Sequence, residues 1–297
     1  MNYDFDVIAM QRMLEDRLVR VISREEWSSL QQRLSQFQKE KKAGSFNLTF
    51  VLMPRLIKKC IVPYDRKSDQ GLKDIRHGFC IQNWEVSRLA RSWWLLHWVT
   101  EDKIEYFKQI NSLFRSAEVN EQVALYGSLP LFAYPDEFRL CAAEGLRTNI
   151  RQVFESIALN NPYPADYLDE AAWNQMVLKS FFMNVAVNQI IGLDQRANGT
   201  LAYILSDYAH ERWSANRSVS PLLWRPVGKF LDERLFPDIE KLFQSEHESD
   251  KKAAALACAQ SSFQLAKEWL QRNNEMNEQI MEGALTWESL EETLLQG

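Results

Sequence analysis

The stretch SLFRSAEVNEQVALYGSLPLF, residues 112–132, contains a helix end, a short polar turn and the start of a second helix. The stretch KLFQSEHESDKKAAALACAQSSF, residues 241–263, repeats this order, because both pass through Leu-Phe-x-Ser and a polar turn into an Ala- or Leu-bearing segment. Such a helix-turn-helix unit cannot bury both of its faces alone, so it needs a neighbour on each side. The two stretches therefore predict an all-α fold, an irregular helical-hairpin array like the HEAT and armadillo α-solenoids.

A third candidate hairpin lies in SLPLFAYPDEFRLCAAEGL, residues 128–146, where Pro135 is placed to open the second helix. Because the units resemble each other only loosely, an ordinary irregular helical domain remains an alternative to a repeat array. We expect residues 1–82 to form an N-terminal helical region that is continuous with a helical-repeat domain over residues 83–297.

The N-terminal region carries two clear helix signals. Residues 5–23 place apolar side chains three and four positions apart, a spacing typical of an amphipathic helix. A second helix is predicted to start after Ser23, whose side chain and that of Glu26 form a capping box. The signal then weakens: FNLTFVLMPRLIKK is a strand or a helix interrupted by proline, and PYDRKSDQG, residues 63–71, is predicted to be a loop.

Composition limits the classes of function. The 297 residues are 46% hydrophobic and 25% charged, as in a globular protein with a large core. A net charge of −5 argues against nucleic acid as a partner, because phosphates bind clustered Lys and Arg. The four cysteines form no CxxC pair and no apolar window is long enough to span a bilayer, so we expect a reducing, cytoplasmic location and no transmembrane segment.

Two further features bear on membranes and on cofactors. Trp93, Trp94 and Trp98 could anchor the protein at a membrane surface, although a buried helical turn is the favoured interpretation of RSWWLLHWV. No Gly-rich phosphate loop, GxSxG elbow or HExxH motif is present, and we predict no cofactor. Two D-x-x-H pairs, ending at His77 and His210, lack the further carboxylates of a di-iron site, so no metal is predicted.

The most polar segment is SDYAHERWSANRSVSPLLWRPVG, residues 206–228. A helix over residues 199–214 would carry one broad apolar half and an opposite polar half. The polar half holds three candidate catalytic residues: Asp207, His210 and Glu211. Arg212 falls in the middle of the apolar half, so it needs a carboxylate or several carbonyl partners unless it escapes at the helix end.

A similar helix over residues 168–184 places Gln175 and Lys179 on a narrow polar stripe. Asn174 falls among apolar residues of this helix. A buried amide must be hydrogen-bonded, and its usual role is to fix the register between neighbouring helices. We favour this structural role for Asn174 over a ligand contact.

Four motifs then occur in one order: EGLRTN at 144–149, NPYPADYLDEAAWNQMVLKSFF at 161–182, GLDQRAN at 192–198 and DYAHERWSANRSVSPLLWRPVG at 207–228. Together they resemble the EboA-domain family of bacterial Ebo gene clusters. The resemblance implies a role in making or exporting secondary metabolites and carries no assigned reaction. It marks as site candidates the motif residues Arg147, Asn149, Asn161, Tyr163, Trp173, Asn174, Asp194, Arg196, Asp207, His210, Glu211, Arg212 and Trp213.

Two functions are consistent with these observations. The first is an accessory protein whose helical groove holds another Ebo-pathway protein or a small intermediate, for which the resemblance suggests a cyclitol- or prenyl-bearing molecule. The second is an enzyme in which His210 acts as general acid or base, tuned by Asp207 or Glu211, while Arg212 or Arg147 holds an anionic substrate. The enzyme requires His210 and polar residues of a second motif to converge in one pocket, and we favour the accessory role.

Overall fold

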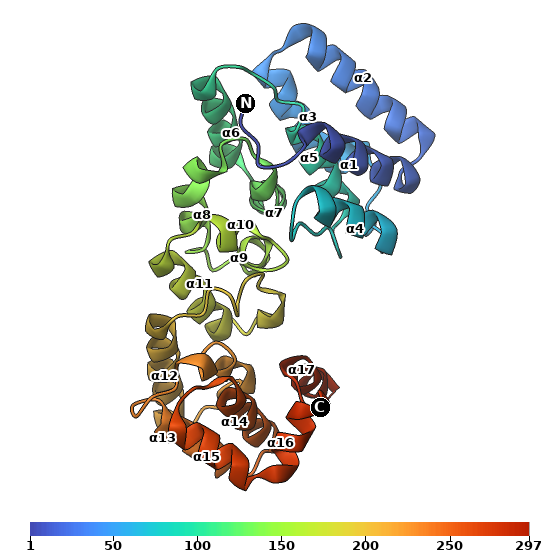
Figure 1. Ribbon diagram of the computed structural model, residues 1–297. Coiled ribbons are helices and arrows are strands. Elements are labelled where there is room, and N and C mark those ends of the chain that lie inside the picture. Colours follow the sequence, from blue (N-terminus) through green and yellow to red (C-terminus); the bar gives the residue numbers. More distant parts are fainter. Residues whose placement is uncertain (297) are drawn as a thin grey trace. The chain divides into compact units, whose positions relative to one another are not determined.

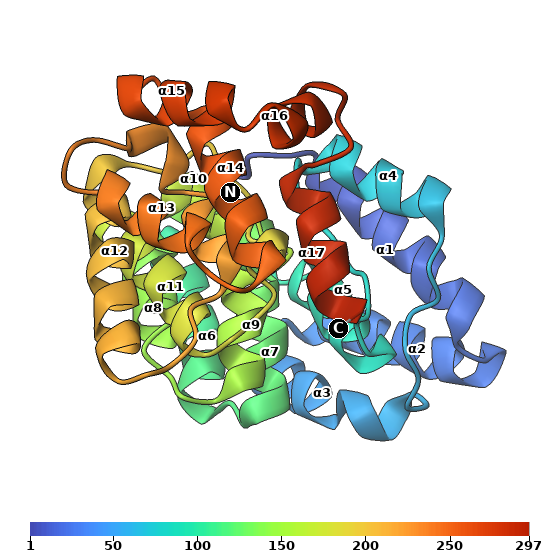
Figure 2. The ribbon, with the colours of Figure 1, turned by 90° about the horizontal axis from the view of Figure 1, so that it is seen from below.

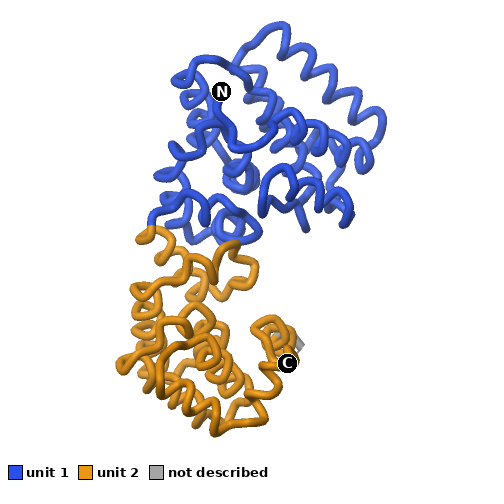
Figure 3. The backbone as a smooth tube through the Cα atoms, viewed as in Figure 1, with its two compact units in different colours: residues 1–169 blue, residues 170–297 orange. Residues whose placement is uncertain are grey.

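The structure, a computed structural model, describes residues 1–296. Over these residues it contains α-helices, short 3-10 helices and no β-strand, and one isolated antiparallel bridge joins Ile61 to Glu85 (Figure 1). The prediction of an all-α fold is therefore confirmed. Contacts divide the chain into two compact units, unit 1 over Met1–Asp169 and unit 2 from Glu170 onward (Figure 3).

Unit 1 contains the first ten α-helices of the chain. They are α1 (Val7–Val21), α2 (Arg24–Glu40), α3 (Ala43–Leu56), α4 (Arg66–Ile75), α5 (Val86–Leu95), α6 (Lys103–Ser116), α7 (Val119–Gly127), α8 (Arg139–Gly145), α9 (Arg151–Ala158) and α10 (Tyr163–Tyr167), with the 3-10 helices η1 (Leu129–Leu131) and η2 (Pro135–Phe138). Helix α1 packs on α5, α5 on α7, and α7 on α9, while α4 covers α1 and α3 lies against α2 and α5. Helices from both sides of residue 82 thus share one core.

An aromatic cluster forms much of that core. Trp93 and Trp94 are fully buried and Trp98 is 5% exposed. The indole of Trp94 donates a hydrogen bond to the carbonyl of Phe46 at 3.1 Å. Burial of all three tryptophans rules out membrane-surface contact through them. No helix within the described residues is both long and apolar enough to cross a bilayer.

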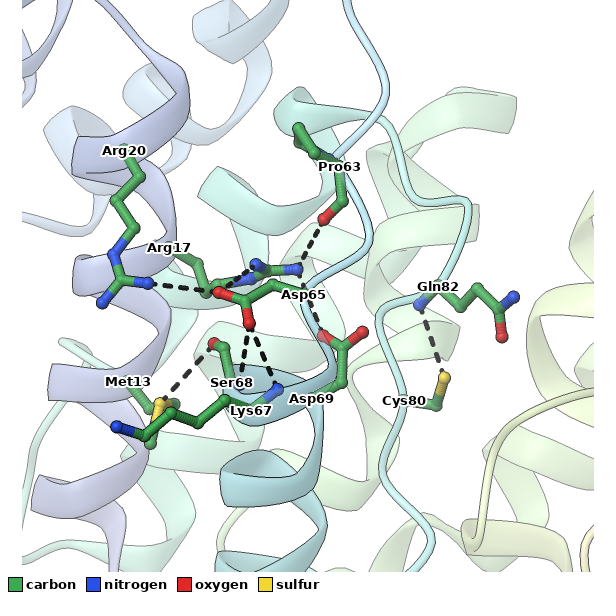
Figure 4. A network of polar contacts seen from close by, with 10 residues as sticks. All are labelled: Met13, Arg17, Arg20, Pro63, Asp65, Lys67, Ser68, Asp69, Cys80 and Gln82. Carbon is green, nitrogen blue, oxygen red and sulfur yellow. Dashed lines mark hydrogen bonds and ion pairs between the residues drawn. The ribbon is translucent and has the colours of Figure 1, made fainter.

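The first helices agree with the sequence, and the fourth does not. Helix α2 begins after Ser23 with the predicted capping box to Glu26. The segment before residue 57 is a helix, α3, with Pro54 in its last turn. The prediction of a loop over residues 63–71 is wrong from Arg66 onward, because Asp65 accepts hydrogen bonds from the backbone N–H groups of Lys67 and Ser68 and so caps α4 (Figure 4).

Unit 2 contains the remaining helices. They are α11 (Glu170–Phe182), α12 (Gly199–Ser214), α13 (Phe236–Phe243), α14 (Glu248–Gln260), α15 (Gln264–Arg272), α16 (Asn274–Met281) and α17 (Trp287–Gln296), with the 3-10 helices η3 (Val187–Gln189), η4 (Pro221–Trp224) and η5 (Gly228–Phe230). Helix α14 is the centre of this unit, because α13, α15, α16 and α17 pack around it (Figure 2), and η4 and η5 also pack against it.

Small side chains allow the neighbouring helices to pack closely against α14. The buried run of α14 is rich in alanine, from Ala253 to Cys258. Gly228 of η5 lies so close to α14 that an added Cβ would stand 2.7 Å from the Cα of Ala257. Any larger residue at position 228 would have to push η5 away from α14.

The predicted hairpins are realised to different degrees. Helices α13 and α14 pack on each other as the 241–263 stretch predicts. Helices α6 and α7 also follow each other across a short turn, but α7 packs mainly on α5 and α9. Pro135 opens the 3-10 helix η2, which leads directly into α8. The positions of the helices thus agree with the prediction from the sequence more closely than the packing of the helices does.

Candidate functional site

Helices α11 and α12 are joined by a reciprocal amide pair. The side chains of Asn174 and Asn198 exchange two hydrogen bonds of 3.2 Å and 2.9 Å, and Asn174 is only 2% exposed. Asn198 also caps α12 by accepting a hydrogen bond of 2.8 Å from the backbone N–H of Leu201. Asn174 is therefore hydrogen-bonded, as the sequence requires of a buried amide, and it ties the middle of α11 to the start of α12.

The polar half of α12 faces outward, as its periodicity predicts, but its residues have separate partners. Asp207 pairs with Arg234 at 3.0 Å on the surface. His210 Nε2 lies 2.5 Å from Oδ1 of Asp238, a buried carboxylate whose other oxygen accepts a hydrogen bond of 2.6 Å from Ser206. Asp207 and His210, two of the three candidate catalytic residues, therefore have different partners, Arg234 just before α13 and Asp238 in its first turn.

Arg212 closes the turn that follows α12. It is half-buried, and its Nε and Nη2 both donate to the backbone carbonyl of Ser218, at 3.0 Å and 2.9 Å. The sequence predicts a carboxylate, several carbonyl partners or escape at the helix end, and the structure shows one carbonyl partner for a half-buried guanidinium in the last turn of α12. Nη1 of Arg212 makes no hydrogen bond or ion pair with the described residues.

Two adjoining pockets lie beside this turn, and we call them together the α11–α12 groove. The first has a volume of about 460 Å³ and the second about 860 Å³. Four residues line both pockets: Phe182, Tyr208, Arg212 and Arg217. The first pocket adds Gln175, Leu178, Lys179 and Glu211, and the second adds Trp213, Ser218, Pro221, Lys241, His247 and Asp250 among others. Glu211, Arg212 and Trp213 of the predicted site are thus brought together here.

The charges along the groove are mostly positive. Lys179, Arg212, Arg217 and Lys241 line it, against the carboxylates of Glu211 and Asp250. Burial lowers the pKa of Lys179 from its ordinary value. The ammonium of Lys241 lies 4.0 Å from the centre of the Trp213 ring, and that ring stacks on buried Trp224. This packing fixes the Lys241 charge at the groove wall.

The remaining candidates of unit 2 serve its framework. Asp194 accepts two hydrogen bonds, at 2.8 Å and 2.7 Å, from the guanidinium of Arg225. Trp173 is fully buried, and the guanidinium of Arg196 lies 4.7 Å from the centre of its ring. None of these three candidates is among the residues that line the groove.

Four candidates belong to unit 1. Asn161 is buried and donates to the carbonyls of Tyr126 and Ser156 while accepting from the backbone of Tyr163. Tyr163 is fully buried and donates to the carbonyl of Pro135 at 2.6 Å. Both of these side chains thus fix the course of the backbone through hydrogen bonds to it. On the surface, Arg147, just after the end of α8, pairs with Glu144 of α8 at 3.2 Å, and Asn149 is exposed.

Neither pocket of the groove includes His210. The convergence that the enzyme hypothesis requires is therefore not found in these two pockets. Among the described residues, no three His, Cys, Asp or Glu side chains gather as a metal site would need. The cations and aromatic rings that line the groove are groups suited to binding a ligand.

Several groove residues escaped the sequence analysis. The periodicity of residues 168–184 places Lys179 on a polar stripe but assigns it no function, and Arg217 and Lys241 lie outside the two helices whose periodicity defines the candidate residues. Phe182 is one of the apolar residues of α11, yet its side chain is 70% exposed. The signal that could have found them is the excess of cations around the turn after α12.

The fold and the groove define a helical protein with a positively charged pocket of small-molecule size. The chain belongs to the EboA family, because it matches the family described as metabolite traffic protein EboA over residues 10–228. The match covers every candidate residue named from the sequence and ends before Lys241, so one wall of the groove lies beyond it. Comparison with curated proteins and with solved structures gives no match.

Proposed function

We propose that the protein is an accessory component of a metabolite pathway and that it holds a small-molecule intermediate in the α11–α12 groove. The observation that carries this proposal is the meeting of two pockets, of about 460 and 860 Å³, at Arg212 and Arg217. Ligand pockets of proteins have volumes of about 300–1,000 Å³, so each of the two is large enough for a metabolite. The description of the family as metabolite traffic proteins supports the same role.

Three finer expectations belong to this proposal. A HEAT-like stacking of helical hairpins would present the groove as part of an extended surface, and the packed α13–α14 hairpin supports it. The absence of a CxxC pair supports a cytoplasmic location, and the family resemblance supports a role in secondary metabolism. A cyclitol- or prenyl-bearing intermediate or a second pathway protein would be a suitable occupant.

Purification of the full chain from its native host tests the proposal. The tagged protein would be isolated without denaturation, and its bound small molecules and proteins identified by mass spectrometry. The double variant Arg217→Gln/Phe182→Ala alters the groove, and Arg234→Gln is the control, because Arg234 pairs with Asp207 outside it. A small molecule that accompanies the wild type and the control, but not the groove variant, supports the proposal. If no small molecule accompanies the wild type, the proposal is wrong.

The second candidate is an enzyme that uses His210, and one contact favours it. Buried Asp238 holds one ring nitrogen of His210 at 2.5 Å, while the side chain is 55% exposed, so the other nitrogen is left for proton transfer. His210→Gln keeps a donor toward Asp238 and removes the acid-base group. Loss of pathway output with an unchanged melting temperature would support the enzyme. Normal output would leave His210 with a structural role only.

A further inference from the structure

We propose that the groove takes an amphipathic anion, a molecule with an apolar, ring-containing body and a carboxylate or phosphate at one end. This inference rests on the proposed function, since it names the class of small molecule that the groove would hold. In this arrangement the anionic end lies at the junction of the two pockets, and the apolar body lies along the first pocket. Arg212 and Arg217 define the junction, because both line both pockets.

The anionic end follows from cations that lack carboxylate partners. Among the described residues, no carboxylate lies within ion-pair distance of Arg212 or Arg217, and the side chain of Arg217 makes no hydrogen bond. Two arginines of unit 2 outside the groove are paired, Arg225 with Asp194 and Glu288, and Arg234 with Asp207. The chain has 40 acidic residues against 35 basic ones, and Glu211 and Asp250 line the groove, yet no acidic residue among the described ones pairs with Arg212 or Arg217. A free guanidinium in a pocket is suited to a carboxylate or phosphate, which it binds through two parallel hydrogen bonds.

A third cation is fixed nearby. The ring of Trp213 stacks on Trp224, and the ammonium of Lys241 lies 4.0 Å from the centre of the Trp213 ring. Trp213 thus serves as a wall that holds Lys241 at the second pocket. The positive charge consequently extends from the junction into the second pocket, where a larger anionic group such as a phosphate would be accommodated.

The apolar body follows from the first pocket. Phe182, the last residue of α11, is 70% exposed, and it lines the pocket together with Leu178 and Tyr208. Exposed aromatic side chains that line a pocket commonly mark a binding surface, because covering them removes apolar area from water. Aromatic rings prefer offset or edge-to-face contact with other rings, so a ring-containing body fits this wall well.

Isothermal titration calorimetry of the full chain at low salt tests the inference with matched probes. 2-Naphthoate and 2-naphthyl phosphate carry the body and the anion, 2-naphthamide carries the body alone, and inorganic phosphate carries the anion alone. We expect the two naphthyl anions to bind about tenfold more tightly than the amide and inorganic phosphate, because charge-assisted hydrogen bonds add to the apolar contact. Their affinity should fall as salt rises, since the cations are partly exposed.

Two variants separate the contributions. Arg217→Gln should weaken naphthoate about tenfold and leave the amide unchanged, whereas the control Arg234→Gln changes neither. Phe182→Ala should weaken naphthoate and the amide alike, with Met281→Ala as the control, because Met281 is 81% exposed and does not line the groove. Both groove side chains are exposed, so the variants should fold normally.

The outcomes distinguish the two proposals. If the amide binds as tightly as the anions, or Arg217→Gln has no effect on naphthoate, the inference is wrong while the groove remains a metabolite site. If the molecule that accompanies the native protein is cationic or uncharged, the inference is wrong in the same way. If neither a native molecule nor any probe binds, both the inference and the proposed function fail.

Discussion

Two groups of cations in this protein differ in the carboxylate and carbonyl partners of their charged groups. In unit 1, Arg17 of α1 is 4% exposed and lies 3.3 Å from Asp65, 3.1 Å from Asp69 and 2.7 Å from the carbonyl of Pro63 (Figure 4). In the α11–α12 groove, Arg217 is exposed and has no such partner among the described residues. A buried charge must be neutralised by the protein itself, whereas a charge at a pocket wall can be kept for a ligand. The buried ion pairs of Arg17 stabilise the fold. The exposed charge of Arg217 costs the fold little free energy and is available to bind a ligand.

The carboxylates around Arg17 also show this difference. Hydrogen bonds from the backbone N–H groups of Ser68 and Lys67, together with Arg17 and Arg20, hold the pKa of Asp65 below its ordinary value. The carboxylate of Asp65 therefore caps α4 and also pairs with the guanidinium of Arg17 in α1. No carboxylate plays such a double role for Arg212 or Arg217 in the described part of unit 2.

The largest effect is expected from removing the buried cation. Arg17→Met leaves Asp69 without its cation in a largely buried place, so the free energy of unfolding should fall by about 3 kcal/mol. Urea denaturation followed by circular dichroism measures this change. Arg20→Met is the matched control, because Arg20 also pairs with Asp65 but its side chain is 63% exposed. Equal losses in the two variants would show that Arg17 is not the central charge of this network.

An intermediate effect is expected at the amide pair of unit 2. Asn174→Leu leaves the side chain of Asn198 with one lost partner in a half-buried position, which should cost about 2 kcal/mol. Gln175→Leu changes the neighbouring exposed residue and should alter stability by no more than about 0.5 kcal/mol. Thermal or urea unfolding of both variants gives the comparison. A loss at position 174 no larger than at 175 would mean that the pair does not hold α11 to α12.

The smallest effects are expected at the turn after α12 and at the surface ion pair of α12. Arg212→Met removes both hydrogen bonds to Ser218 and should cost about 1–2 kcal/mol. Asp207→Asn removes only an exposed ion pair with Arg234 and should cost about 0.5 kcal/mol. The same unfolding measurement decides between them, and equal losses would contradict the placement of Arg212 in the closing turn of α12.

Local patterns predicted much of the helical structure. The apolar spacing of residues 5–23 and the capping box at Ser23 correspond to α1 and α2. Helix α4 was missed because Pro, Asp and Gly in residues 63–71 are typical of turns, while Asp65 uses the same chemistry to start a helix. The family could be recognised from four ordered motifs, and the match over residues 10–228 confirms it.

The site could be predicted only in part, because its residues are joined by contacts that no single helix encodes. Periodicity correctly put Asp207 and His210 on the outer half of α12, and it could not reveal that Asp238 meets His210. It likewise could not bring Lys241 beside Trp213, since 28 residues separate them. Exposure of Phe182 depends on what packs over the end of α11, which is again a tertiary property.

The amide pair between Asn174 and Asn198 has a consequence for how binding can be studied. Both groups are uncharged at every ordinary pH, so their two hydrogen bonds respond to neither proton concentration nor ionic strength. The spacing of α11 and α12 should therefore stay constant while salt or pH is varied. A change of ligand affinity with salt would then reflect the contact between ligand and guanidinium, and not a change in the spacing of α11 and α12.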